Sequence, residues 1–285
     1  MKAYFPTLKI NLASFNAHFS RHVIGQISTI DLENYQAKRK AAGYSDSYVD
    51  QEVGAAKTVV SKAFDNDLVS GETVKVFKRV KKLQKRNANA RDKILSKEQF
   101  DRLIECSPRL TKCLLITAFY TGMRRGEILA LTWNKVNMER RLICLEAADT
   151  KDREPRQIPI SEPLYEVLKS IPKAVHDNHV FQYKGKPVSD IRTGLIKACK
   201  AAQIPYGRFV KDGFVFHDLR HTFNTYMRKA GVPESLIMDI TGHSTREMFD
   251  RYNTLDYDDK KQAVDRLQTY LTDVTHVTHV TQAEE

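Results

Sequence analysis

The sequence feature that most constrains the fold is a strongly apolar segment near the middle of the chain, residues 110–121. Its pattern predicts a buried helix, which Gly122 can end because glycine readily adopts the left-handed backbone conformation. Ile128 and Leu131 then return to a core. Arg124 lies at the break between these apolar parts, so its guanidinium group is expected on a rigid element. Its planar fork could hold two phosphate oxygens, although a surface arginine would fit this segment equally well.

Length and charge bound the class of protein. A chain of 285 residues can form one large domain or two medium ones, and 41% hydrophobic residues is ordinary for a globular protein. There is no run of about 18 apolar residues that would predict a membrane helix, and the N-terminus lacks the apolar segment of a signal peptide. The net charge of +11 favours nucleic acid or an acidic surface as a partner, or else a merely basic enzyme.

Most of the net positive charge lies in the first third of the chain. Residues 1–93 hold 17 Lys and Arg against 9 Asp and Glu, an excess of eight, whereas the remainder holds an excess of three. No acid occurs from Val74 to Arg91. Because an acid-free basic run beside a domain junction favours phosphate contact, we predict DNA contacts there. The predicted contact residues are Lys75, Lys78, Arg79, Lys81, Lys82, Lys85 and Arg86.

Residues 1–88 are predicted to form an all-helical domain. No alternating strand pattern occurs there, and apolar residues recur at spacings of three and four, as on one face of a helix. The clearest such stripe consists of Val53, Ala56, Val60 and Phe64.

A second domain is expected over residues 94–272, followed by a flexible tail at 273–285. Ser96 and Gln99 form the capping-box pattern that starts a helix. Strands are predicted at 141–146 and 156–160, and further helices at roughly 162–171, 189–202, 217–230, 233–241, 244–253 and 257–271. The predicted fold class is therefore mainly α, with a small antiparallel sheet in a mixed but mostly helical second domain.

The segment FHDLRHTF concentrates polar residues on one side of a predicted helix. At about 100° per residue, that side carries His217, Arg220, His221 and Asn224, and the opposite side is apolar. We therefore expect the polar side to face something other than the core. Zinc held by His217 and His221 is the rival interpretation, but Arg220 lies between them and would repel a cation. An anion site is favoured.

Two further segments contribute candidate residues. In TGHSTREMFDRYNT, Ser244 and Glu247 form a second capping-box pattern, which places His243 at a helix N-terminus that favours anions. Tyr252 follows in the same predicted helix, although taken alone it fits a tyrosine with a packed ring and a solvated hydroxyl better. Lys151 lies near a predicted hairpin turn, where most lysines serve only solubility.

The four cysteines indicate no metal site. Cys106, Cys113, Cys144 and Cys199 form no CxxC pair and no metal-like cluster with the histidines. Disulfides are not needed, so a reducing cytoplasm fits the sequence.

At the candidate positions the sequence resembles the tyrosine recombinase (phage integrase) family. The matching motifs are T-G-x-R at 121–124, H-x-L-R-H at 217–221, G-H at 242–243, and a tyrosine nine residues after that histidine, in this order. The resemblance covers nearly the whole chain. It implies a core-binding (SAM-like) DNA-binding domain at 1–88 and a catalytic domain at 94–272. Within the family, the segment GHSTREMFDRYNT resembles integrases of phages and integrative elements more than chromosome-dimer resolvases.

The resemblance implies roles for the phosphate-binding residues. Arg124 and Arg220 would clamp the non-bridging oxygens of the scissile phosphate. His243 would hydrogen-bond that phosphate and stabilise the charge of the transition state. Glu127, one helical turn after Arg124, would orient the arginine side of the site.

The resemblance also implies which residues form the covalent bond and move protons. Tyr252 would be the nucleophile and form a 3′-phosphotyrosyl link, and His217 would help to deprotonate it. Lys151 would be the general acid for the 5′-hydroxyl leaving group. The reaction would cut and rejoin DNA for integration or excision of a mobile element, without metal, ATP or another cofactor.

The partners implied by the resemblance are double-stranded DNA with core-type recombination sites, a homotetramer on DNA in synapsis, and accessory DNA-bending proteins. The helix predicted at 257–271 would pack on a neighbouring protomer. Many phage integrases carry a further arm-binding domain; this chain starts at the core-binding region, so we expect that domain to be missing or to have been removed. We expect the protein in the bacterial cytoplasm, associated with the nucleoid, with no membrane partner.

Three rival functions remain open from the sequence. A type IB topoisomerase or a telomere resolvase would use the same chemistry. A DNA-binding protein that has kept the fold without catalysis is a second rival, although it would have no use for a phenol and a general acid. A metal-dependent hydrolase built on His217, His221 and His243 is the third.

Overall fold

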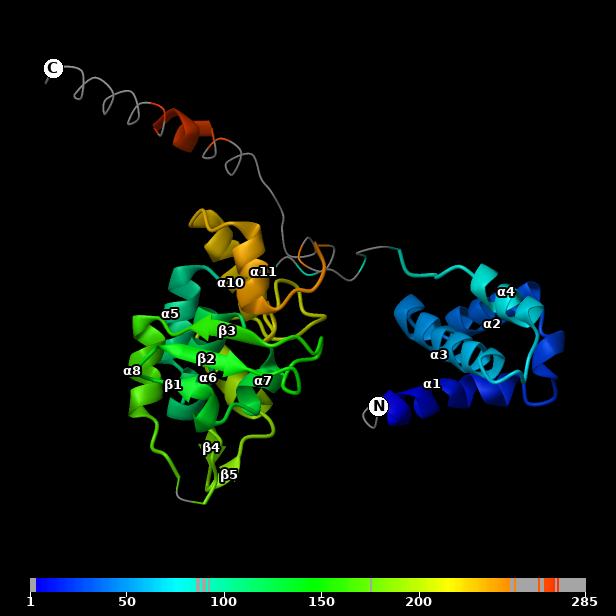
Figure 1. Cartoon of the computed structure of the whole chain (residues 1–285), viewed down its shortest axis with the longest axis horizontal. Coiled ribbons are helices and arrows are strands. Elements are labelled where there is room, and N and C mark those ends of the chain that lie inside the picture. Colours follow the sequence, from blue (N-terminus) through cyan, green and yellow to red (C-terminus); the bar gives the residue numbers. More distant parts are fainter. Residues whose placement is uncertain are drawn as a thin grey trace, which may run out of the picture. The chain divides into compact units, whose positions relative to one another are not determined.

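The computed structural model describes residues 4–85, 88, 91, 93–174, 176–246, 249, 261, 264–269 and 271. The chain divides into two compact units, residues 1–89 and 90–285 (Figure 1). Among the described residues, no helix is both long and apolar enough to span a membrane. Several predictions lie outside the described residues: those for Arg86, Glu247 and Tyr252, for the tail at 273–285, and for most of the helices at 244–253 and 257–271.

The described part of the first unit is all-helical, as predicted. Its elements are α1 (Tyr4–His18), the short 3-10 helix η1 (Ile24–Gln26), α2 (Thr29–Ala41), α3 (Asp46–Phe64) and α4 (Gly71–Arg79). The hydroxyls of Ser28, Ser45 and Ser70 accept a backbone hydrogen bond at the starts of α2, α3 and α4. Such caps satisfy amide groups that have no partner within the helix.

The apolar stripe of α3 packs into the core of this unit, except at its end. Val53, Ala56 and Val60 are buried together with Leu32 and Phe77, whereas Phe64 is 46% exposed. Phe64 is the last residue of α3, so the stripe leaves the core where the helix ends.

A buried ion pair joins α2 to α3. Glu52 is fully buried and accepts hydrogen bonds from Tyr35 Oη at 2.8 Å and from Arg39 Nη2 at 2.6 Å. Because a buried carboxylate is costly unless it is paired, this contact ties the two helices in one register.

The predicted DNA-contact residues that the structure describes are all exposed: Lys75, Lys78, Arg79, Lys81, Lys82 and Lys85.

The second unit is mostly helical with a small antiparallel sheet, as predicted. Its helices are α5 (Lys97–Glu105), α6 (Arg109–Thr121), α7 (Arg125–Leu129), the 3-10 helix η2 (Trp133–Lys135), α8 (Glu162–Ser170), α9 (Arg192–Ala201), α10 (Asp218–Lys229) and α11 (Glu234–Thr241). Its strands are β1 (Val136–Asn137), β2 (Leu142–Leu145), β3 (Arg156–Pro159), β4 (Gln182–Tyr183) and β5 (Lys186–Pro187).

The three-stranded sheet has the order β1-β2-β3, and Ile143 of β2 lies opposite Ile158 of β3. The predicted strands at 141–146 and 156–160 are confirmed as β2 and β3. The sequence did not reveal β1 or the hairpin β4–β5, because strands of two residues are too short for an alternating pattern. Figure 1 shows that hairpin at the end of the unit away from α10 and α11.

Helix α6 lies at the centre of the second unit, where α5, α8 and α10 pack against it. It ends at Gly122, which is left-handed with φ 61°, as predicted. A Cβ atom at this position would lie 2.6 Å from the Phe223 ring and 2.9 Å from the Thr241 side chain. The absence of a side chain at Gly122 therefore lets the end of α6 approach α10 and α11 closely.

Candidate active site

The candidate site is built around two helix ends that both terminate in a left-handed glycine. Gly122 ends α6, and Gly242 ends α11 with φ 69°. Arg124 follows the first glycine and His243 follows the second. The two glycines thus turn the chain sharply where these functional side chains begin.

Arg124 is the N-cap residue of α7 and is held by two acids. Its Nη1 donates to Glu127 Oε1 at 3.2 Å, and its Nη2 donates to Asp152 Oδ2 at 2.6 Å. The Arg124 amide also donates to Glu127 Oε2 at 2.8 Å. Glu127 therefore holds both the backbone and the side chain of Arg124.

Arg220 is buried in α10 and lies between the two glycine turns. Its Nη1 donates to the carbonyls of Gly122 at 2.8 Å and of Thr241 at 2.6 Å, and its Nη2 lies 3.0 Å from His243 Nε2. The guanidinium group therefore donates hydrogen bonds to the end of α6 and to the end of α11 at the same time.

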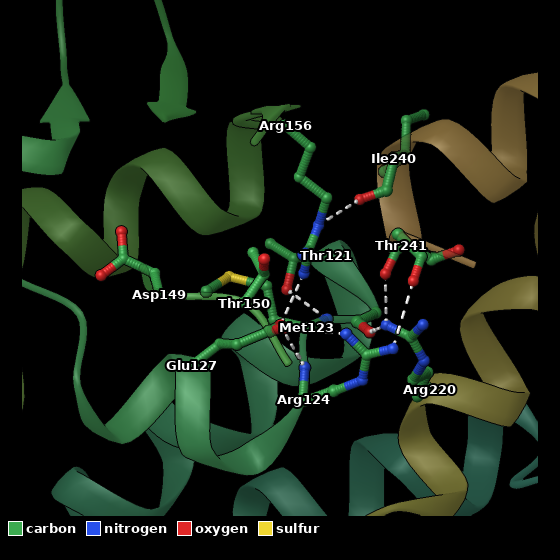
Figure 2. A network of polar contacts seen from close by, with 12 residues as sticks. Thr121, Met123, Arg124, Glu127, Asp149, Thr150, Arg156, Arg220, Ile240 and Thr241 are labelled. Carbon is green, nitrogen blue, oxygen red and sulfur yellow. Dashed lines mark hydrogen bonds and ion pairs between the residues drawn. The ribbon is translucent and has the colours of Figure 1, made fainter. Parts of the chain in front are cut away.

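Three arginines bind three consecutive carbonyls at the end of α11. Arg156 Nε donates to Ile240 O at 3.1 Å, Arg220 Nη1 to Thr241 O, and Arg124 Nη2 to Gly242 O at 3.2 Å (Figure 2). Adjacent residues in a chain are only about 3.8 Å apart, so these bonds bring the guanidinium groups together. The carbonyl end of a helix also carries partial negative charge that favours such cations.

The hydrogen bonds assign the tautomer of His243. Thr241 Oγ1 donates to Ile237 O at 2.6 Å, so it accepts from His243 Nδ1 at 2.7 Å. Nδ1 therefore carries the proton, and Nε2 accepts from Arg220. Burial lowers the pKa of His243 to about 3, and the nearby charges of Arg220 and Arg124 act in the same direction. The ring is neutral at physiological pH and, as placed, orients Arg220.

We predict that replacing His243 with glutamine removes part of the pH dependence of stability. The pKa of His243 is lower in the folded chain than its ordinary value of 6.5, so the unfolded chain binds the proton first as the pH falls. The free energy of unfolding is thus retained above pH 6.5 and lost below it, at up to about 1.4 kcal/mol per pH unit for one proton. Urea unfolding between pH 7 and pH 5 measures this slope.

The control for this prediction is His22→Gln, a change at an exposed histidine of the first unit. The free energy of unfolding of this variant should change with pH as steeply as that of the unchanged chain. Equal slopes for the His243→Gln protein and the unchanged chain would contradict the buried, neutral state of His243.

His217 is the N-cap residue of α10 and is exposed at the start of that helix. Partial desolvation of its ring lowers its pKa, and the charge of Arg220 and, more weakly, that of Arg124 lower it further. His217 thus lies within electrostatic range of Arg220 and Arg124. A neutral imidazole can accept a proton, as a general base requires.

The polar side of α10 is more buried than predicted. His221 is 3% exposed and Asn224 is 2% exposed, so the expectation that this side faces away from the core is wrong for both. Helix α10 packs against α6 and α11, and protein covers more of its circumference than its sequence pattern indicates. The described residues contain no group of three His, Cys, Asp or Glu side chains arranged to hold a metal ion, so His217, His221 and His243 do not form one.

Lys151 lies in the connection between β2 and β3, and its side chain is exposed. The residues beside it are anchored. Thr150 is buried and donates to Glu154 O at 3.1 Å, Asp149 forms an ion pair with Lys135, and Asp152 contacts Arg124. The connection therefore presents Lys151 next to the arginine side of the site.

The sequence reasoning missed two residues of this network, Arg156 and Asp152. Arg156 is 7% exposed at the first position of β3, where inward and outward residues alternate. A charged residue at an inward position of a predicted strand was the available signal. Nothing in the local sequence distinguished Asp152 from an ordinary turn acid.

Comparisons with known proteins agree with this fold. The integrase of Salmonella phage P22 is 29% identical over 173 residues, which cover 58% of this chain and 44% of that protein. The chain thus spans less than half of the length of that relative. Tyrosine recombinase XerA of Pyrococcus furiosus is 24% identical over 239 residues, which cover 83% of this chain and 79% of XerA.

The fold is that of a tyrosine recombinase. A crystal structure of a lambda integrase tetramer bound to a Holliday junction matches with a TM-score of 0.69 and 13% identity, over 90% of this chain and 74% of that one. The Phage integrase family matches residues 93–259, which is more than half of the chain. The chain belongs to that family.

Proposed function

We propose that this chain is a site-specific tyrosine recombinase that cuts and rejoins DNA for integration or excision of a mobile element. The observation that carries the proposal is the convergence of Arg124, Arg220 and His243 on the end of α11. Two guanidinium groups held this close match the non-bridging oxygens of one phosphodiester. Their positions are fixed before DNA arrives, which is what electrostatic stabilisation of a transition state requires.

In the proposed cleavage step, the oxygen of Tyr252 bonds to the scissile phosphorus and the bond from phosphorus to the 5′-oxygen breaks. A phenol with a pKa of about 10 is a poor nucleophile at neutral pH, so a base must take its proton. The neutral His217 is suited to that role. Arg124 and Arg220 balance the negative charge that gathers on the phosphorane, and His243 holds Arg220 in place.

Lys151 is the proposed general acid. The departing 5′-oxygen would be a strongly basic alkoxide unless it receives a proton as the bond breaks. An ammonium group on the β2–β3 connection supplies that proton and recovers it when the strand is rejoined. Because the phosphotyrosyl link retains the energy of the phosphodiester, the proposed cycle requires no ATP.

The proposed partners are duplex DNA and further copies of the chain. The exposed lysines and arginines on and after α4 can bind backbone phosphates, which would position the duplex without selecting its sequence. The tetramer of lambda integrase on a Holliday junction supports a tetramer in synapsis here. Accessory DNA-bending proteins and action at the bacterial nucleoid, in the cytoplasm, belong to the same proposal.

The test uses a nicked suicide duplex that carries the crossover site of the element encoding the chain. We expect a covalent protein–DNA adduct on denaturing gels that is unchanged by EDTA. Failure to form the adduct would contradict the proposal and favour a DNA-binding protein without catalysis. DNA cleavage that leaves no adduct and that EDTA prevents would instead favour the metal-dependent hydrolase.

A supercoiled plasmid distinguishes the proposal from the rival with the same chemistry. A site-specific recombinase should act on plasmids carrying the crossover site. Relaxation with no preferred sequence would instead favour a type IB topoisomerase.

We predict that Asp152→Asn strengthens anion binding at the site. The Asp152 carboxylate occupies one donor of Arg124 at 2.6 Å, where it competes with an incoming phosphate. Both side chains are about one-fifth exposed, so the pair is worth on the order of 1 kcal/mol or less. Sulfate should therefore reach half of its stabilising effect, measured as the rise in melting temperature, at a concentration about two- to fivefold lower.

The matched control is Asp101→Asn, which removes an exposed ion pair with Lys97 in α5. It should not change the sulfate dependence. Weaker or unchanged sulfate binding by the Asp152→Asn protein would show that the carboxylate does not compete for Arg124.

A further inference from the structure

We propose that Arg156 is a positioning residue for DNA cleavage. It holds the guanidinium group of Arg124 and the turn that leads to His243 in fixed positions relative to each other. This inference rests on the proposed function. The guanidinium group of Arg156 joins three elements, because β3 carries it, α7 provides one of its partners and α11 provides the other (Figure 2).

On the α7 side, Arg156 shares the carboxylate of Glu127 with Arg124. Arg156 Nη2 donates to Glu127 Oε2 at 2.5 Å. The same oxygen accepts from the Arg124 amide, while Oε1 accepts from Arg124 Nη1. Glu127 is 6% exposed, so this buried carboxylate depends on both arginines for its compensation. Arg156 thus determines where Glu127 lies, and Glu127 determines where the Arg124 fork points.

On the α11 side, Arg156 supports the turn that leads to His243. Its Nε donates to the carbonyl of Ile240, three residues before His243. A Cβ atom on Gly242 would lie 2.9 Å from Arg156 Nη1, so the turn packs closely on the guanidinium plane. Thr241 and Gly242 in this turn provide the carbonyls that Arg220 and Arg124 bind. A shift of the turn would therefore move both phosphate-binding arginines.

Only an arginine side chain can bind the Glu127 carboxylate and the Ile240 carbonyl at the same time. Its guanidinium presents Nε–H and Nη–H groups in different, fixed directions, whereas lysine has one ammonium group at the end of a flexible chain. Lysine at position 156 could keep the pair with Glu127 and lose Ile240, or the reverse. Methionine would keep similar volume and lose both contacts.

The test measures single-turnover cleavage of the suicide duplex by the Arg156→Met and Arg156→Lys proteins. We expect adduct formation to slow by about 10- to 100-fold for methionine, as for other residues that orient a reacting group, and by less for lysine. Affinity for the duplex should stay within about twofold, because most phosphate contacts lie elsewhere. Arg141→Met, which removes an exposed ion pair between the residue before β2 and Glu162 of α8, should cleave like the unchanged chain.

A second substrate separates positioning from a general loss of structure. A methyl group that replaces one non-bridging oxygen of the scissile phosphate gives a neutral methylphosphonate. This substrate needs less charge compensation from Arg124 and Arg220. The defect of the Arg156→Met protein should then shrink to about threefold or less relative to the unchanged chain. An equal defect on both substrates would overturn the positioning role.

A double substitution tests the route through Glu127. If Arg156 acts on Arg124 through this carboxylate, Glu127→Gln combined with Arg156→Met should slow cleavage much less than the product of the two single effects. Effects that simply multiply would contradict the route through Glu127.

If the unchanged chain formed no adduct, the proposed function itself would fail. Normal cleavage by the Arg156→Met protein would refute only the role of Arg156.

Discussion

Replacing Tyr252 with phenylalanine is expected to abolish the covalent protein–DNA adduct. The variant has no oxygen that could bond to phosphorus, so no other feature of the site can replace the lost step. The positions of Arg124 and Arg220 depend on α7, α10 and α11, so the variant should still bind the duplex with an affinity within about twofold. Denaturing gels measure the adduct, and mobility shifts measure the binding.

The matched control is Tyr257→Phe, a change at the next tyrosine in the chain. It should form the adduct at the rate of the unchanged protein. An adduct formed by the Tyr252→Phe protein, or lost only in the Tyr257→Phe protein, would show that the nucleophile has been misassigned.

Replacing Arg220 with lysine is expected to slow cleavage by about 10²–10³-fold or more, because it removes a fixed donor from the phosphate site. Lysine keeps the charge but cannot reach Gly122 O, Thr241 O and His243 together, as the guanidinium does. The His243 ring then loses the group that it orients. A single-turnover assay with the suicide duplex measures the rate.

The same substitution should also destabilise the fold by about 1–3 kcal/mol, because it leaves buried carbonyl groups without their donor. Urea unfolding measures this cost and shows whether the slow protein is folded under assay conditions. Arg125→Lys is the control, since Arg125 is exposed and adjacent to Arg124. Cleavage by the Arg220→Lys protein at the rate of this control would remove Arg220 from the proposed phosphate site.

Local sequence patterns predicted the features that depend on neighbours in the chain. The capping box of Ser96 and Gln99, the burial of α6 and its end at Gly122 all appear as expected. Each follows from contacts within a few residues, where spacing and residue type decide the outcome. The family motifs likewise selected Arg124 and Arg220 as candidate residues, and the structure brings both to the end of α11.

Patterns failed where the burial of a side chain depends on distant elements. The polar side of α10 was expected to face away from the core, but His221 and Asn224 on that side are buried. A helical wheel describes one helix and contains no information about how many neighbours surround it. For the same reason, the inward-facing Arg156 could be seen in the sequence but not assigned a partner.

The sequence by itself determined the mainly helical class with a small sheet, and it supplied the candidate motif residues, because these depend on composition, periodicity and short spacings. Only the tertiary structure decided that Arg156, Arg220 and Arg124 take the consecutive carbonyls of Ile240, Thr241 and Gly242. The arginines come from positions separated by up to about a hundred residues. Folding brings them together because the end of one helix offers three carbonyls that need donors, and buried guanidinium groups need acceptors.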